Sequence, residues 1–140
     1  MLFPKVNMNN RDKILVVDDD HDACTALGGF LEESGFAVEA VLDGARALAR
    51  LDQLVPDLVL TDLQMPGMNG LELIRRIQSR HKGVPVILVT GMETGDLCTS
   101  AGGYGAVECL VKPVNTDELL WAIDRALACC RRPDASRRPA

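Results

Sequence analysis

Carboxylate, hydroxyl and amine side chains stand at the ends of short apolar runs in this sequence. In chain order they are Asp18, Asp19, Asp62, Thr90 and Lys112. Carboxylates that are crowded together repel one another, and a divalent cation relieves the repulsion. Magnesium suits such a cluster because it binds few carboxylates, keeps several waters and engages phosphate. A carboxylate can also accept a phosphoryl group, which a nearby lysine and hydroxyl would stabilise.

These residues can meet only if the runs before them become neighbouring strands. The runs are almost continuously apolar, which is typical of parallel strands covered on both faces. The predicted strands are 13–18, 36–41, 57–61, 84–90 and 106–111, and the predicted helices between and after them are 20–34, 44–54, 70–81, 92–103 and one from 115 onward. Five such units predict an α/β fold, a doubly wound three-layer sandwich whose strands share one carboxyl edge.

The sequence also indicates where the helices begin and which faces they bury. The predicted N-caps are Asp20, Asp43, Asn69 and Asn115, and Gly35 is a stop signal for the first helix. The first helix carries a stripe at Ala23, Leu27, Phe30, Leu31 and Ser34, and the last helix an apolar face at Leu119, Ile123, Ala126, Leu127 and Cys130. Glycines at 95, 102 and 103 predict a short or loose fourth helix, because an interior glycine costs about 1 kcal/mol.

Composition narrows the class of protein. The 140 residues suffice for one domain, and a net charge of −5 argues against a nucleic-acid surface spread over it. The absence of an apolar run near ~20 residues and of a signal peptide predicts a cytoplasmic protein without a membrane partner. We expect a flexible segment at 1–12, one domain at 13–130 and a disordered tail or linker start at 131–140. Five cysteines without ligand spacing predict reduced, mostly buried thiols.

Four motifs at the predicted strand ends resemble the response-regulator receiver domain of two-component signalling. The motifs are Val17-Asp18-Asp19, Asp62-x-x-Met65-Pro66-x-x-x-Gly70, Val89-Thr90 and Val111-Lys112-Pro113. Each motif alone is weakly specific, but all four in order form a strong signal that covers nearly the whole chain. The resemblance implies a flavodoxin-like five-stranded parallel sheet with strand order 2-1-3-4-5.

The resemblance also implies a role for each candidate site residue. Asp62 would be the phospho-acceptor, Thr90 would swing toward the phosphate and Lys112 would pair with it. The ligands of Mg²⁺ would be Asp18, Asp19, Asp62 and the backbone carbonyl of Gln64, and the Lys112–Pro113 bond would be cis. The implied function is a phosphorylation-dependent switch rather than an enzyme. A sensor histidine kinase or phosphotransfer protein would phosphorylate it, which would change its partner-binding surface.

Cys109 departs from the family pattern, which usually has Tyr or Phe three residues before the lysine. Either the fourth helix transmits the signal without an aromatic switch, or the coupling between phosphorylation and the output face is weak. Gln64 and Met92 occupy positions that tune the rate of phospho-aspartate hydrolysis in the family. An apolar Met92 would shield the acyl phosphate from water, which predicts a phospho-aspartate lifetime longer than the shortest in the family. Trp121 lies on the last helix, opposite Leu119. The fourth helix, fifth strand and fifth helix form the family's usual output face, where an output partner or a second copy is expected.

Two other functions stay open at this point. One is a phosphate-independent interaction module, which Cys109 and the glycine-rich fourth helix would favour. The other is an aspartate-nucleophile phosphohydrolase, but such enzymes need a second carboxylate two residues after the nucleophile, where this chain has Gln64. The residues leave open the cognate kinase, the output, the oligomeric state, and whether this is a single-domain regulator or a piece of a larger regulator or hybrid kinase.

Overall fold

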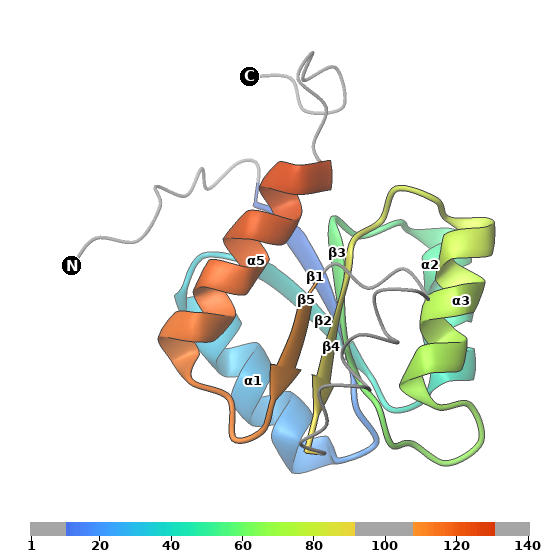
Figure 1. The fold of residues 1–140 in the computed structure, drawn as a ribbon, viewed down its shortest axis with the longest axis horizontal. Coiled ribbons are helices and arrows are strands. Elements are labelled where there is room, and N and C mark those ends of the chain that lie inside the picture. The colour runs from blue at the N-terminus through green and yellow to red at the C-terminus, as the bar shows by residue number, and fades with distance from the viewer. Residues whose placement is uncertain (1–10, 92–107, 131–140) are drawn as a thin grey trace.

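The computed structural model describes residues 11–91 and 108–130. Within them a single sheet contains β1 (Lys13–Val17), β2 (Ala37–Val41), β3 (Leu58–Asp62), β4 (Val86–Thr90) and β5 (Glu108–Val111). The helices are α1 (His21–Glu33), α2 (Gly44–Gln53), α3 (Gly70–Arg80) and α5 (Thr116–Cys130). All strand pairs are parallel, in the order β2-β1-β3-β4-β5. The predicted α/β class and strand order are confirmed (Figure 1).

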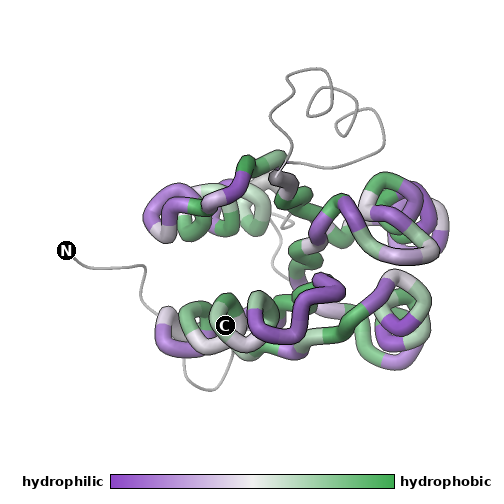
Figure 2. The backbone as a smooth tube through the Cα atoms, turned by 90° about the horizontal axis from the view of Figure 1, so that it is seen from below, coloured by the Kyte–Doolittle hydropathy of each residue, from purple (hydrophilic) through white to green (hydrophobic). Residues whose placement is uncertain are grey.

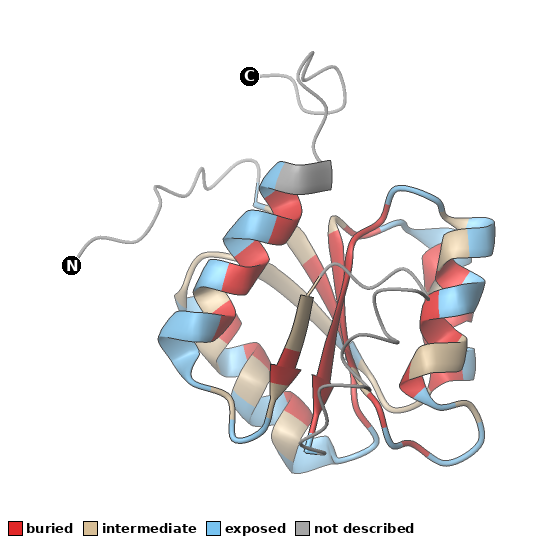
Figure 3. Cartoon of the chain, viewed as in Figure 1, coloured by how far each residue is buried: buried red, intermediate tan, exposed pale blue. Residues whose placement is uncertain are grey.

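Helices cover both faces of the sheet, with α1 and α5 on one side and α2 and α3 on the other (Figure 1). The inner strands β1, β3 and β4 are mostly buried, and every residue of β4 is buried (Figure 3). Hydrophobic strands lie between the two helix pairs (Figure 2). Separate apolar clusters fill the two spaces, one around Leu31, Ile87 and Ile123, the other around Leu51, Ile77 and Leu88. The site residues therefore project from a rigid, close-packed scaffold.

The described helices begin at capping residues. Side-chain oxygens of Asp20, Asp43, Asn69 and Asn115 accept hydrogen bonds from backbone N–H groups of the following turn. All four predicted N-caps are confirmed. Helix α1 ends before Gly35, whose φ of +105° lies in the left-handed region that favours glycine.

The cap at Asn69 allows a direct stability test, because it stabilises the start of α3 just after the site loop. Its Oδ1 accepts from the Glu72 N–H at 2.9 Å. We expect Asn69→Ala to lower the free energy of unfolding by about 1 kcal/mol. Asn69→Asp, which retains an acceptor, should be close to wild type in the same urea titration. An alanine variant that loses less than about 0.3 kcal/mol would show that this cap contributes little.

The predicted stripe of α1 is only partly right. The buried positions of the helix are Cys24, Gly28 and Leu31, whereas Ala23, Leu27 and Phe30 are half-buried. The physical reason is the close approach of α1 to β2 at Gly28, where an added Cβ would already contact Val38 Cγ1 at 3.5 Å. This approach turns the Cys24–Gly28–Leu31 line toward the sheet. The apolar face predicted for α5 is confirmed at Leu119, Ile123, Ala126 and Leu127.

Some predictions fall on residues that the structure does not describe. The fourth helix at 92–103, Met92, and the terminal segments 1–10 and 131–140 all lie outside the described residues. Within the described part of the chain, no helix combines the length and apolar character that a membrane span requires.

Candidate functional site

The strand register brings the candidate residues to one edge of the sheet. Asp62 pairs with Val89 across β3 and β4, and Thr90 pairs with Val111 across β4 and β5. Because all the strands run in the same direction, the residues that follow them emerge at the same edge. The residues that the sequence placed at strand ends therefore lie together at one edge of the sheet.

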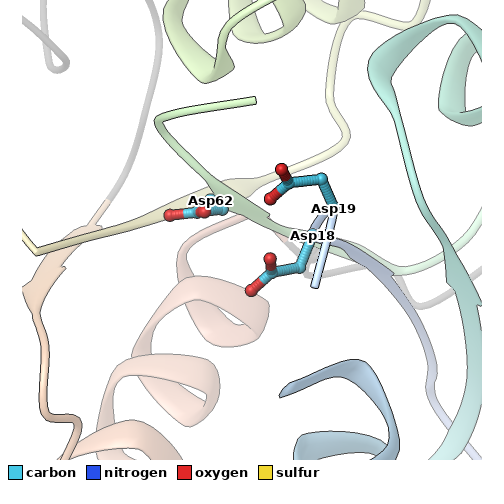
Figure 4. A group of neighbouring side chains, drawn as sticks. All are labelled: Asp18, Asp19 and Asp62. Atoms are coloured by element: carbon cyan, nitrogen blue, oxygen red, sulfur yellow. The ribbon is translucent and has the colours of Figure 1, made fainter. Parts of the chain in front are cut away.

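Asp18, Asp19 and Asp62 form an acidic cluster at this edge (Figure 4). One carboxylate oxygen from each residue lies within 4.8 Å of the others. The side chains of Asp18 and Asp62 are only 10% and 11% exposed, whereas Asp19 is exposed. A cluster that offers only oxygen ligands, with one open side, fits a hard divalent cation such as Mg²⁺.

Lys112 places a positive charge against the acidic cluster. Its Nζ lies 3.4 Å from Asp62 Oδ1 and 3.7 Å from Asp18 Oδ2. The backbone holds it there, because the Lys112 N–H donates to the Thr90 carbonyl at 2.7 Å. The Lys112–Pro113 peptide bond is cis, as the family resemblance implied. The ammonium group thus offsets part of the negative charge while remaining accessible to a ligand.

The surroundings of Asp18 shift the pKa of its carboxyl group. Burial is the largest cause that raises its pKa above the ordinary value, and the nearby charge of Asp62 raises it further. The hydrogen bond from the Asp20 N–H to Asp18 Oδ1, 2.9 Å long, and the charge of Lys112 act in the opposite direction. The carboxylate form of Asp18 is therefore held at a cost, which a bound cation would relieve.

The loop after β3 holds Asp62 through its backbone. Asp62 Oδ1 accepts from the Leu63 N–H at 2.9 Å, and the Thr61 hydroxyl donates to the Asp62 carbonyl at 2.9 Å. The Gly70 N–H donates to the Leu63 carbonyl at 2.7 Å, so the start of α3 closes back on the site. Gly67 makes the turn between them with φ of +80°. The Met65-Pro66-Gly67 segment thus has the structural role expected of turn residues.

Thr90 and Gln64 occupy the flanks of the acidic cluster. Thr90 is fully buried at the end of β4, one residue beyond the partner of Asp62 in the neighbouring strand. Gln64 is exposed two residues after Asp62. Short side-chain distances join the three aspartates and Lys112, while Thr90 and Gln64 are placed by their positions in the strand and the loop.

Two contributions of cysteine were not anticipated from the sequence. The buried thiol of Cys24 donates to the Asp18 carbonyl at 3.3 Å, and burial raises the pKa of this thiol. Its helical spacing to Leu31 was the only signal that could have placed it against the sheet.

Cys109 is half-buried against the α2–α3 side of the core and forms a disulfide bond. The expectation of reduced cysteines holds for Cys24 and is wrong for Cys109.

The fold and site together define a doubly wound α/β domain with an acidic cluster and a lysine at the carboxyl edge of its sheet. The family model of the response regulator receiver domain matches residues 14–124. The chain therefore belongs to the response-regulator receiver family, whose members are phosphorylation-dependent signalling domains.

Curated relatives and solved structures agree with this assignment. The chain is 36% identical to the transcriptional regulatory protein ZraR of Klebsiella oxytoca, over 82% of this chain and 26% of that protein. It is also 36% identical to the DNA-binding transcriptional regulator NtrC of Escherichia coli strain K12, over 84% of this chain and 25% of that protein. A CheY-like receiver domain protein from Methanospirillum hungatei superposes with a TM-score of 0.81 at 30% identity, covering 86% of this chain and 96% of that one. The chain spans about a quarter of the length of the curated relatives it matches.

Proposed function

We propose that this domain is a signalling switch in which Asp62 accepts a phosphoryl group. The observation that supports the proposal best is the convergence of three carboxylates within 4.8 Å, with Lys112 Nζ 3.4 Å from Asp62 Oδ1. Asp62 is the central carboxylate, since it belongs to the acidic cluster and also faces the lysine. A nucleophile beside a fixed cation is what phosphoryl transfer to a carboxylate requires.

Each side chain of the site would have its own role in the phosphoryl transfer. An Asp62 oxygen attacks phosphorus, and the bond from phosphorus to the leaving group breaks. Lys112 pairs with the added phosphoryl oxygens, and the hydroxyl of Thr90 donates to one of them. Asp18, Asp19, Asp62 and the carbonyl of Gln64 would hold Mg²⁺, which when bound neutralises charge on the transferred group. The added charge then shifts the balance between two conformations of the domain.

The phosphoryl donor would be a sensor histidine kinase or a phosphotransfer protein, and the compartment would be the cytoplasm. The receiver unit would span 13–130, with 1–12 and 131–140 as flanking segments. Because the curated relatives are transcriptional regulators several times longer than this chain, an output partner or domain is part of the proposal.

The exposed side of β5 and α5 is the best-supported partner surface among the described residues. Trp121 is 71% exposed, and the guanidinium of Arg125 lies 5.8 Å from the centre of its ring. Arg125 also donates to Glu108 on β5 at 3.0 and 3.2 Å, so the tryptophan and both charged groups form one patch across two elements. An aromatic ring and an arginine are typical anchors of protein interfaces, and we assign output or self-association to this patch.

Intact-mass measurement tests the proposal directly. With Mg²⁺ and acetyl phosphate, the full chain should gain one phosphoryl group, and peptide mapping should place it on Asp62. The gain should disappear in EDTA and in Asp62→Asn, which preserves the shape of the side chain. Failure of the wild-type protein to gain mass or to bind beryllofluoride would favour the phosphate-independent interaction module. Multiple turnover of a phosphomonoester would instead favour the phosphohydrolase.

A further inference from the structure

The thiol of Cys24 lies behind the acidic cluster, where the first turn of α1 meets the ends of β1 and β2. Its Sγ donates to the Asp18 carbonyl at 3.3 Å and lies 3.9 Å from the Val41 carbonyl. The residue is only 4% exposed, so the hydrogen bond is shielded from water. A side chain of α1 thus holds the backbone of a residue in the cluster.

The backbone of Asp18 is anchored on both sides, from two different elements. The Asp18 N–H donates to the Val41 carbonyl of β2 at 3.2 Å, and the Asp18 carbonyl accepts from the Cys24 thiol of α1. Peptide groups are planar, so the first bond orients the peptide before Asp18 and the second orients the peptide that joins Asp18 to Asp19. That second peptide connects two of the three carboxylate-bearing residues of the cluster.

The charges of the cluster act against this arrangement. Oxygens of Asp18, Asp19 and Asp62 lie within 4.8 Å of one another, and like charges at this separation repel. Asp19 is exposed, and an outward rotation of its peptide would relieve the repulsion. The bond from Cys24 opposes that rotation before a cation binds. Because Mg²⁺ demands near-ideal octahedral geometry, ligands that are already in place bind it more tightly.

We infer that Cys24 is a positioning residue, which holds the Asp18–Asp19 peptide in the orientation that binds Mg²⁺. This inference rests on the proposed function, since the cation serves the phosphorylation of Asp62. Cys24 acts through the Asp18 backbone and touches neither the cation nor the phosphoryl group. Its contribution is therefore to the affinity for Mg²⁺, and a saturating concentration of Mg²⁺ compensates for its loss.

Two substitutions at Cys24 separate positioning from packing. Cys24 also belongs to the apolar cluster between the sheet and the α1–α5 side, and a buried cysteine behaves as a small hydrophobe. If packing were its whole role, serine would be no better a substitute than alanine. Serine, however, keeps a donor for the Asp18 carbonyl, whereas alanine removes it. The positioning role therefore predicts that Cys24→Ser retains the affinity for Mg²⁺ and that Cys24→Ala loses it.

Titration of the full chain with Mg²⁺ alone measures this affinity, with the amide resonances of residues 18–20 as the signal and no phosphodonor present. Cys24→Ala should raise the dissociation constant about fivefold, as expected for the loss of one hydrogen bond. Cys24→Ser should stay within about twofold of the wild type. Initial rates of phosphorylation by acetyl phosphate should follow the same order at low Mg²⁺ and converge at saturating Mg²⁺.

Ser34 provides a matched control on the same helix. Its hydroxyl donates to the Phe30 carbonyl at 2.9 Å, at the end of α1 that lies away from the acidic cluster. Ser34→Ala removes a side-chain donor from a backbone carbonyl, as Cys24→Ala does. The affinity for Mg²⁺ should nevertheless equal that of the wild type, because the peptide between the two acidic residues is untouched.

Each outcome of the titration decides a specific point. A wild-type protein that does not respond to Mg²⁺ would overturn the proposed metal site together with this inference. A wild-type dissociation constant in Cys24→Ala would overturn the inference alone. A serine variant that binds Mg²⁺ about fivefold more weakly would also overturn it, even if the alanine variant failed to fold, because a retained donor would then have no effect.

Discussion

Asp18→Asn is expected to make the metal-free protein more stable while it lowers the rate of phosphorylation by at least about 100-fold. Burial and the charge of Asp62 raise the pKa of Asp18 above its ordinary value of 3.8. The folded protein then binds the Asp18 proton more tightly than the unfolded chain does. The stability contributed by this group is consequently present below the unfolded pKa and is lost as the pH rises through the folded pKa. At pH 7 the ionised carboxylate is a cost, which the neutral amide removes.

Urea titrations in EDTA at pH 7 and near pH 4 measure the first half of this prediction. The variant should gain about 1 kcal/mol at pH 7, a size common among stabilising substitutions, and the gain should shrink toward pH 4. The amide oxygen can still accept the hydrogen bond from the Asp20 N–H, so the turn after β1 should persist. Initial rates of mass gain with acetyl phosphate and Mg²⁺ measure the second half, because the variant lacks one proposed ligand.

Asp43→Asn is the matched control for this substitution. Asp43 caps α2 by accepting from the Arg46 N–H at 2.7 Å, and asparagine caps about equally well. Both stability and phosphorylation should stay near the wild-type values. If Asp18→Asn instead destabilised the metal-free protein at pH 7, the carboxylate of Asp18 would be a net stabilising group, and the electrostatic account of the acidic cluster would be wrong.

Gly70→Ala is expected to lower the free energy of unfolding by about 3 kcal/mol, at the upper end for an overpacked site. A Cβ at Gly70 would lie 2.4 Å from the Asp62 carbonyl oxygen and 2.9 Å from Leu63 Cα. Both neighbours are backbone atoms, so no side chain can rotate away to make room. Relief requires the loop that carries Asp62 to move. In the fraction that folds, we expect about a 100-fold slower phosphorylation, because small displacements of reacting groups are costly.

The same substitution at Gly29 should have the opposite effect on stability. Gly29 is an exposed helical residue, and a Cβ there would meet nothing within 4 Å. Gly29→Ala should therefore raise the free energy of unfolding by about 0.5–1 kcal/mol through helix propensity, with phosphorylation unchanged. Thermal unfolding and initial phosphorylation rates of the two variants make the comparison. A wild-type rate and stability in Gly70→Ala would show that the close contact beneath Asp62 has no functional consequence.

The local features of this protein followed from the sequence alone. Apolar runs predicted all five strands to within about two residues at the ends that the structure describes, and Asp20, Asp43, Asn69 and Asn115 predicted the helix starts. These features depend on residues within one turn or one strand of each other, so they can be predicted from the order of residues in the sequence. The order of the four motifs was specific enough to indicate the family and strand order, which the structure and the comparisons confirm.

Tertiary structure decided the features that depend on how the elements pack. The side chains of Asp62 and Lys112 are fifty positions apart, and only the pairing of β3, β4 and β5 brings them to 3.4 Å. Helical periodicity predicted an apolar face for α1 but not its rotation, which the approach at Gly28 sets. That rotation buries Cys24 against the Asp18 carbonyl and leaves Leu27 half-buried. Periodicity constrains one element at a time, whereas contacts between elements depend on the fit of surfaces that are distant in the chain.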